Sequence, residues 1–264
     1  MPFTAAHPAI VLPLRRWCPR LFVWSALLIG TITPDLECFL VLRPEAQHGV
    51  TFYGSFYFCL PAGLLLFVLL QTLLRKPLAL LLPRRWRQAV WPVARRPFVV
   101  TWRSGLSLIA SILVGAWLHQ IWDAFTHAGH WGVEALPFLQ TTLAVYDDYR
   151  FSVFRLLQHS SSLVGVTLLA VAAWRWKIRQ PAAPAPALNE RLRIALLTLL
   201  VVAPSVAALV RAIGPAAPHV GIERARQFVG HTAIGVISFA ALGLLLVGFA
   251  ITLCWGRLVT EEDS

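Results

Sequence analysis

The chain has 264 residues, of which 58% are hydrophobic and only 13% are charged, and its formal net charge is +11. Soluble globular proteins carry roughly twice that charged fraction, so the composition predicts a membrane protein. The basic residues gather in short segments beside apolar runs, which is the pattern of cytoplasmic loops. We therefore expect the lipid bilayer as a partner, and no nucleic acid.

Six apolar runs each reach the ~20 residues that a helix needs to cross a bilayer. In chain order they are residues 21–42, 55–74, 104–122, 156–174, 194–213 and 230–255. The apolar run before Arg15 and Arg16 is shorter and contains Pro8 and Pro13. We predict an all-α polytopic membrane helix bundle, with about six long spanning helices and a short N-terminal re-entrant or interfacial helix.

The distribution of charge predicts the topology. The segment 75–103 contains no acidic residue and eight basic ones: Arg75, Lys76, Arg84, Arg85, Arg87, Arg95, Arg96 and Arg103. Short loops rich in Lys and Arg stay in the cytoplasm, so we expect this one inside. The second basic cluster, at 175–193, then lies on the same side, and segments 43–54, 126–155 and 214–229 lie outside. The histidines at the outer level are His48, His119, His127, His130, His159, His219 and His231.

The stretch HQIWDAFTHAGH, residues 119–130, is the densest polar feature. His119 and Asp123 are four residues apart, so in a helix they share a face about 6 Å apart and can bind one ion. His127 lies about 12 Å along the axis from His119. It either holds a second ion with Asp123 bridging, or swings back if the helix ends near Thr126. An imidazole with a carboxylate suits zinc, manganese or iron.

A second reading is that these residues merely lie at the membrane interface, where polar groups cost little. Asp123 and Asp35 argue against it, because an ionisable residue in or at the edge of a spanning segment is costly and usually functional. Pro34 should end or kink its helix and present Asp35 and Glu37 at a cavity. We therefore favour a metal or proton-handling site. His7 either descends to this level in a re-entrant segment or stays in the cytoplasm.

Five stretches, in this order, resemble the bacterial membrane proteins grouped as domain-of-unknown-function family 4184. They are MPFTAAHPAIVLPL, LIGTITPDLECFL, HGVTFYGSFYFCLPAGLLL, GAWLHQIWDAFTHAGH and LLQHSSSLVG. The resemblance implies a multi-pass protein of the bacterial inner (cytoplasmic) membrane, with its basic loops in the cytoplasm. We expect a family-like membrane domain at 1–175 that carries the polar site, a cytoplasmic Pro/Ala linker at 176–193, and a C-terminal pair of spanning helices with an acidic tail at 194–264.

The chain is also distantly similar to the membrane-bound metal-dependent hydrolases. Their pattern is an N-terminal His, Pro-Asp-x-Asp, a His-Arg-Gly-x-Thr-His block, and His-x-x-x-Asp-x-x-Thr. The similarity implies a ligand set of His7, Asp35, His48, His119 and Asp123, and it favours the re-entrant placement of His7. Two departures matter. A glutamate, Glu37, replaces an aspartate, and the middle block keeps one histidine instead of two, which disfavours a two-metal site.

These observations lead to two hypotheses. The first is a metal-dependent hydrolase that uses a divalent ion, zinc or manganese, on a phosphoester, lipid-linked or other small-molecule substrate near the outer membrane face. His127, His159 and Glu37 are its candidate catalytic residues, because they lie near the expected ligands and can transfer protons. The alternative is a non-enzymatic transporter or assembly protein whose His/Asp cluster handles ions or protons.

Overall fold

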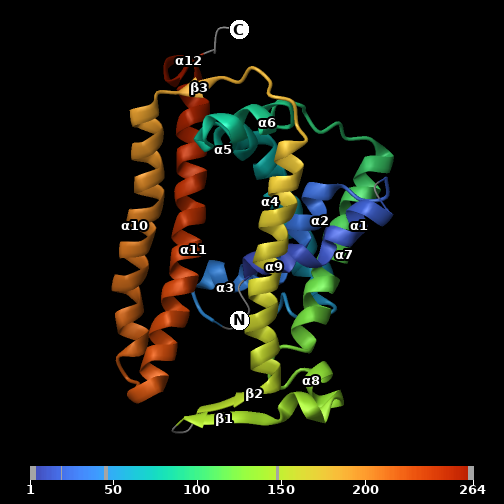
Figure 1. The fold of residues 1–264 in the computed structure, drawn as a ribbon, viewed down its shortest axis with the longest axis vertical. Coiled ribbons are helices and arrows are strands. Elements are labelled where there is room, and N and C mark those ends of the chain that lie inside the picture. The colour runs from blue at the N-terminus through green and yellow to red at the C-terminus, as the bar shows by residue number, and fades with distance from the viewer. Residues whose placement is uncertain (1–3, 19, 45–46, 147–148, 261–264) are drawn as a thin grey trace. The chain divides into compact units, whose positions relative to one another are not determined.

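The computed structural model describes residues 4–18, 20–44, 47–146 and 149–260 and is an all-α polytopic membrane helix bundle (Figure 1). Among these residues, five helices are long and apolar enough to cross a membrane. They are Ser55–Leu81, α7 (Trp102–Ala124), α9 (Val153–Ile178), α10 (Glu190–Ala216) and α11 (Gly221–Leu253). The first of these combines η3 (Ser55–Cys59), α4 (Leu60–Leu69), η4 (Leu70–Leu74) and α5 (Arg75–Leu81).

A sixth apolar run forms two short helical segments that are long and apolar enough to span only when they are counted together, and we call them the broken span. Its halves are α2 (Trp24–Gly30) and the stretch Thr33–Val41, which are bent by 40°. The second half consists of a 3-10 turn, η2 (Thr33–Asp35), and α3 (Leu36–Val41). Pro34 has no N–H to continue the helix, and the Thr31 and Thr33 hydroxyls donate to the carbonyls of Leu28 and Gly30. The prediction that the helix breaks near this proline is confirmed, and five of the six predicted runs form long helices of spanning length.

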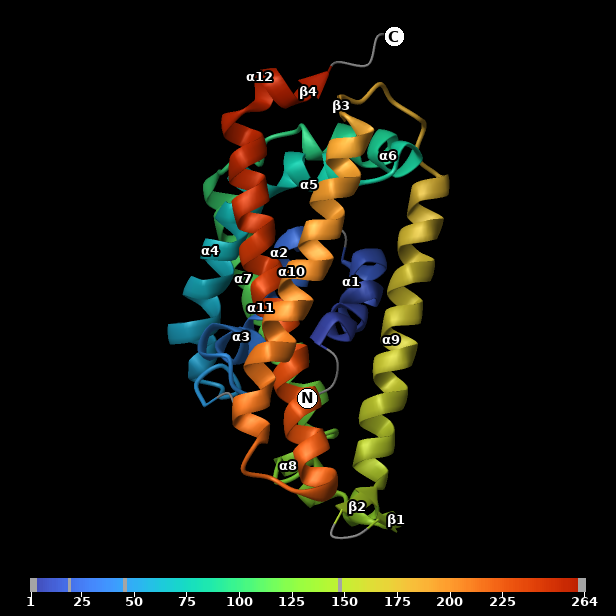
Figure 2. The same cartoon turned by 90° about the vertical axis from the view of Figure 1, so that its left-hand side faces the viewer.

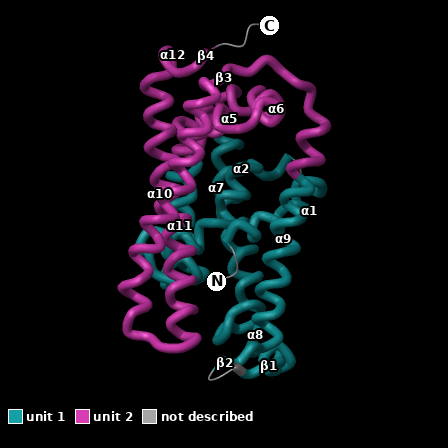
Figure 3. The backbone as a smooth tube through the Cα atoms, turned by 60° about the vertical axis from the view of Figure 1, so that its left-hand side comes forward, with its two compact units in different colours: residues 1–67, 100–172 teal, residues 68–99, 173–264 magenta. Residues whose placement is uncertain are grey.

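The chain divides into two compact units, coloured separately in Figure 3. Unit 1 comprises residues 1–67 and 100–172, and unit 2 comprises residues 68–99 and 173–264. Each unit therefore combines segments that are distant in the sequence, and residues 68–99 group with the C-terminal helices. All the candidate site residues belong to unit 1.

In unit 1, α2 packs against α7 at very short range because glycines face each other. A Cβ on Gly115 would be 2.5 Å from the Leu27 carbonyl oxygen, and one on Gly30 would be 2.3 Å from that of Ile112. Small residues allow such close backbone approach in membrane helices. The contact fixes the position of α7 along its axis relative to the broken span. It therefore also fixes the positions of the polar residues that follow these glycines on α7 and on the broken span.

The predicted short N-terminal helical segment is confirmed as η1 (Thr4–Val11) and α1 (Leu12–Trp17). η1 contacts both α7 and α2, and its buried residues include two polar ones, Thr4 and His7. It also reaches α9, where Gly165 leaves room for the Ala6 backbone.

The segment between α7 and α9 contains short elements. They are α8 (Trp131–Ala135), η5 (Pro137–Gln140) and an antiparallel hairpin of β1 (Thr142–Tyr146) and β2 (Tyr149–Ser152). The hairpin lies directly at the start of α9 (Figure 1). Val133, Leu139 and Phe154 pack together in a small buried core.

In unit 2, α10 and α11 run side by side along their lengths (Figure 2). The basic segment contains an amphipathic helix, α6 (Arg84–Ala94), and Trp91 on it stacks on Trp255. After the Pro/Ala stretch, β3 (Ala187–Leu188) pairs with β4 (Val259–Thr260), which follows α12 (Trp255–Leu258). Residues 261–264 of the acidic tail lie outside the described residues.

Candidate metal centre

The candidate site lies at the C-terminal end of α7. His119 and Asp123 are on the same buried face, and their side chains are 0% and 9% exposed. The four-residue spacing places both side chains on one face of α7 and brings His119 Nε2 to 3.2 Å from Asp123 Oδ2.

The backbone of the broken span determines the tautomer of His119. Its Nδ1 donates to the Thr31 carbonyl oxygen at 2.8 Å, and a carbonyl can only accept. The remaining nitrogen, Nε2, lies 3.2 Å from an Asp123 oxygen and 3.6 Å from Asp35 Oδ1. If the ring is neutral, Nε2 carries a lone pair, and this lone pair points at the two carboxylates.

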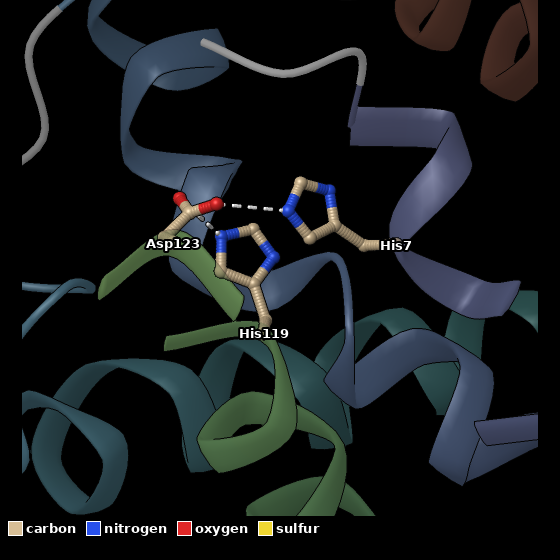
Figure 4. Close-up of side chains that lie close together, drawn as sticks. All are labelled: His7, His119 and Asp123. Carbon is tan, nitrogen blue, oxygen red and sulfur yellow. Dashed lines mark hydrogen bonds and ion pairs between the residues drawn. The ribbon is translucent and has the colours of Figure 1, made fainter. Parts of the chain in front are cut away.

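η1 brings the third ligand candidate to the same place. His7 Nε2 is 3.0 Å from Asp123 Oδ1, and its side chain is 1% exposed. The His7 and His119 rings stack, with centroids 3.9 Å apart and an interplanar angle of 19°. Figure 4 shows the two imidazoles approaching Asp123 from η1 and α7.

His7, His119 and Asp123 could hold a metal ion, because each offers a ligand atom within 4.8 Å of the other two. Two imidazole nitrogens and a carboxylate form a donor set that zinc and manganese accept. The sequence had placed His7 either here or in the cytoplasm, and the structure puts it beside Asp123.

Asp35 borders this group. Thr4 Oγ1 donates to Asp35 Oδ2 at 2.6 Å, which turns the other oxygen towards His119. Thr4 was not among the predicted site residues. It precedes His7 by three residues, and residues three apart share a face of a 3-10 helix, so the signal existed once η1 was known to be 3-10.

Two other predicted residues lie apart from the triad. His48 is 54% exposed at its side chain, with Nδ1 at 3.4 Å from Glu37 Oε1 and its ring edge-on to Tyr57. The other oxygen of Glu37 accepts from the backbone N–H groups of Gln47, His48 and Gly49 at 2.8–3.2 Å. In the structure, Glu37 thus holds the loop 47–49 in place.

His127 folds back towards the site because α7 ends at Ala124. Its Nδ1 is 3.6 Å from Asp123 Oδ1, and its Nε2 is 3.3 Å from the Gln158 amide nitrogen of α9. Of the two alternatives for His127, the structure shows the one in which the helix ends and the ring swings back. Burial lowers the pKa of His127, and the Asp123 carboxylate opposes that shift.

His159 is exposed on α9, and its ring stacks on Phe151 at the hairpin. Among the described residues, it makes no hydrogen bond or ion pair with the triad. The acid/base role predicted for it therefore stays a prediction without a contact to support it.

A family model for a domain of unknown function, DUF4184, matches residues 1–249. The chain belongs to the DUF4184 family. The match includes α10 and most of α11, so it extends well beyond the motifs in the first 175 residues. No curated protein and no solved structure matches the chain significantly.

Proposed function

We propose that this DUF4184 protein is a membrane-embedded, metal-dependent hydrolase. In this proposal it acts on a phosphoester or lipid-linked substrate near the outer face of the bacterial inner membrane, and its basic segments 75–103 and 175–193 are cytoplasmic. The first segment has eight basic residues and no acidic one, and the second has five basic residues and one acidic one, an excess that supports this orientation.

The observation that carries the proposal is the position of His119 Nε2, which faces the carboxylates of Asp123 and Asp35 at 3.2 and 3.6 Å. Buried carboxylates need a compensating charge, because burying them unpaired is very costly. Two imidazolium cations could supply it, but their rings, stacked at 3.9 Å, would repel each other. A divalent cation between the rings and carboxylates balances two negative charges and leaves both imidazoles neutral.

In the proposed site, His7, His119 and Asp123 hold the ion and Asp35 stands beside it. A bound divalent ion would supply a water of lowered pKa and stabilise negative charge that develops on the substrate. The Thr31 carbonyl orients His119, and such outer contacts tune a metal site strongly. His127 is the proton-transfer candidate on geometry, since its side chain is 22% exposed and lies next to Asp123.

Metal analysis of the purified protein tests the proposal. We expect about one equivalent of zinc or manganese in the wild type, because the triad provides one set of ligands. Asp123→Asn keeps the size of the side chain but removes its charge, so it should lose the metal. His159→Ala is the matched control, since it removes an exposed histidine and should retain the metal.

His48→Ala separates the three-residue group from the five-residue set that the hydrolase similarity implies. Retained metal supports the triad with Asp35, and lost metal would bring His48 into the ligand set. A wild-type protein that carries no metal after purification and reloading would refute the site. Metal retention without hydrolysis of any phosphomonoester or lipid phosphate tested would favour ion handling instead.

A further inference from the structure

A cavity of about 210 Å³ adjoins the candidate metal centre within unit 1. One wall is η1, through Ala6, His7 and Ala9, and the opposite wall is the face of α9 from Ser161 to Leu168. Trp122 of α7 closes one side. The cavity exists because the facing positions are small, and at Gly165 a Cβ would lie only 2.9 Å from the Ala6 carbonyl oxygen.

The walls of this cavity are apolar in character. The hydroxyls of Ser161 and Ser162 donate to the Gln158 carbonyl of their own helix, at 3.1 and 2.8 Å. Apolar cavities take up apolar ligands, and one of about 150 Å³ is large enough for benzene. This cavity is larger, so it has room for a segment of an alkyl chain.

One polar group on the wall connects the cavity to the metal centre. His7 lines the cavity, and its Nε2 faces Asp123 in the triad. Its other nitrogen, Nδ1, is buried and has no hydrogen-bond partner among the described residues. It points away from Asp123 (Figure 4). A ligand whose tail occupies the cavity can therefore place its head next to the triad.

The exposed residues around the cavity indicate how such a ligand reaches it. The cavity face of α9 belongs to a spanning helix, and Val164 and Leu168 are 56% and 50% exposed. In the hydrocarbon region of a bilayer, these exposed surfaces contact acyl chains. In a bilayer, the cavity wall would therefore be continuous with a surface that contacts lipid, and lipids would be the molecules within its reach.

We propose that this cavity binds the acyl chain of the substrate, a lipid whose phosphoester head group lies at His7, His119 and Asp123. The inference rests on the proposed function for the head group, whereas binding of the chain depends only on the cavity. Water-soluble phosphoesters are then poor substrates, because they leave the cavity unfilled.

Binding of n-alkyl phosphates, from methyl to dodecyl, to the protein in lipid nanodiscs tests this proposal, with empty nanodiscs subtracted. Each methylene that enters the cavity should tighten binding about fourfold, from ~0.8 kcal/mol per buried CH₂, until the cavity is full. Ser161→Phe fills the cavity and should weaken octyl phosphate binding at least tenfold. Ser160→Phe is the matched control, because Ser160 is exposed one residue away and also donates to its own helix.

Equal affinity of the Ser160→Phe and Ser161→Phe variants for octyl phosphate, or affinity that does not depend on chain length, would overturn the proposal. Octanol separates the two hypotheses, since it has the chain without the phosphate. If the protein holds no metal, the proposed function fails, but Ser161→Phe should still weaken octanol binding. If the protein holds metal and octyl phosphate binds no more tightly than octanol, the head group does not reach the triad and the inference is wrong.

Discussion

Gly115→Ala should damage the candidate metal centre although Gly115 lies one helical turn from it. The added Cβ would be 2.5 Å from the Leu27 carbonyl oxygen, 0.9 Å less than the 3.4 Å at which ordinary contact begins. If α2 moves away from α7 by that amount, the 2.8 Å bond from His119 to the Thr31 carbonyl exceeds the ~3.2 Å limit of a normal hydrogen bond. Overpacking costs about 1–3 kcal/mol, and loss of an orienting contact costs about 10- to 100-fold in metal affinity.

Thermal unfolding in detergent and zinc competition against a chelator measure the two effects. Gly105→Ala is the matched control, because it makes the same change on the same helix where nothing lies within 4 Å of the new Cβ. That variant should be stabilised slightly, by about 0.5–1 kcal/mol, because alanine favours the helix. If both variants unfold at the same temperature and bind zinc equally, α2 does not orient His119 and the reasoning is refuted.

Three further outcomes are expected. Thr4→Val removes the hydroxyl that donates to Asp35, so zinc affinity should fall about tenfold, while Thr4→Ser should retain it; equal affinities would leave Thr4 without a role. Glu37→Gln removes the charge that holds residues 47–49, so hydrogen exchange of these amides should speed up about tenfold. The metal content should not change. Glu134→Gln, at an exposed glutamate, is the control and should leave this exchange unchanged. EDTA should lower the unfolding temperature, since an ion at 100 times its Kd adds about 2.7 kcal/mol; an unchanged temperature would indicate that protons neutralise the buried carboxylates.

The sequence alone determined the fold class and the break in the first span. Long apolar runs are unfavourable in water and favourable in the hydrocarbon core of a bilayer. Their lengths therefore predict spanning helices. Pro34 cannot donate a backbone hydrogen bond, and the bend at η2 follows from that local chemistry. The pairing of His119 with Asp123 also follows from helical periodicity, because both lie on one uninterrupted helix.

Only the tertiary structure decided which distant residues join that pair. His7 lies on a 3-10 segment whose depth depends on its packing against α7, and no local pattern specifies that depth. His48 shares a motif with the hydrolase pattern, yet the loop that carries it is held at Glu37, apart from the triad. The closeness of α2 to α7, which directs His119 Nε2 towards the two carboxylates, results from glycines meeting across helices. The period of the α-helix lets a sequence specify contacts within one helix. Contacts between helices depend instead on how the surfaces of those helices fit together.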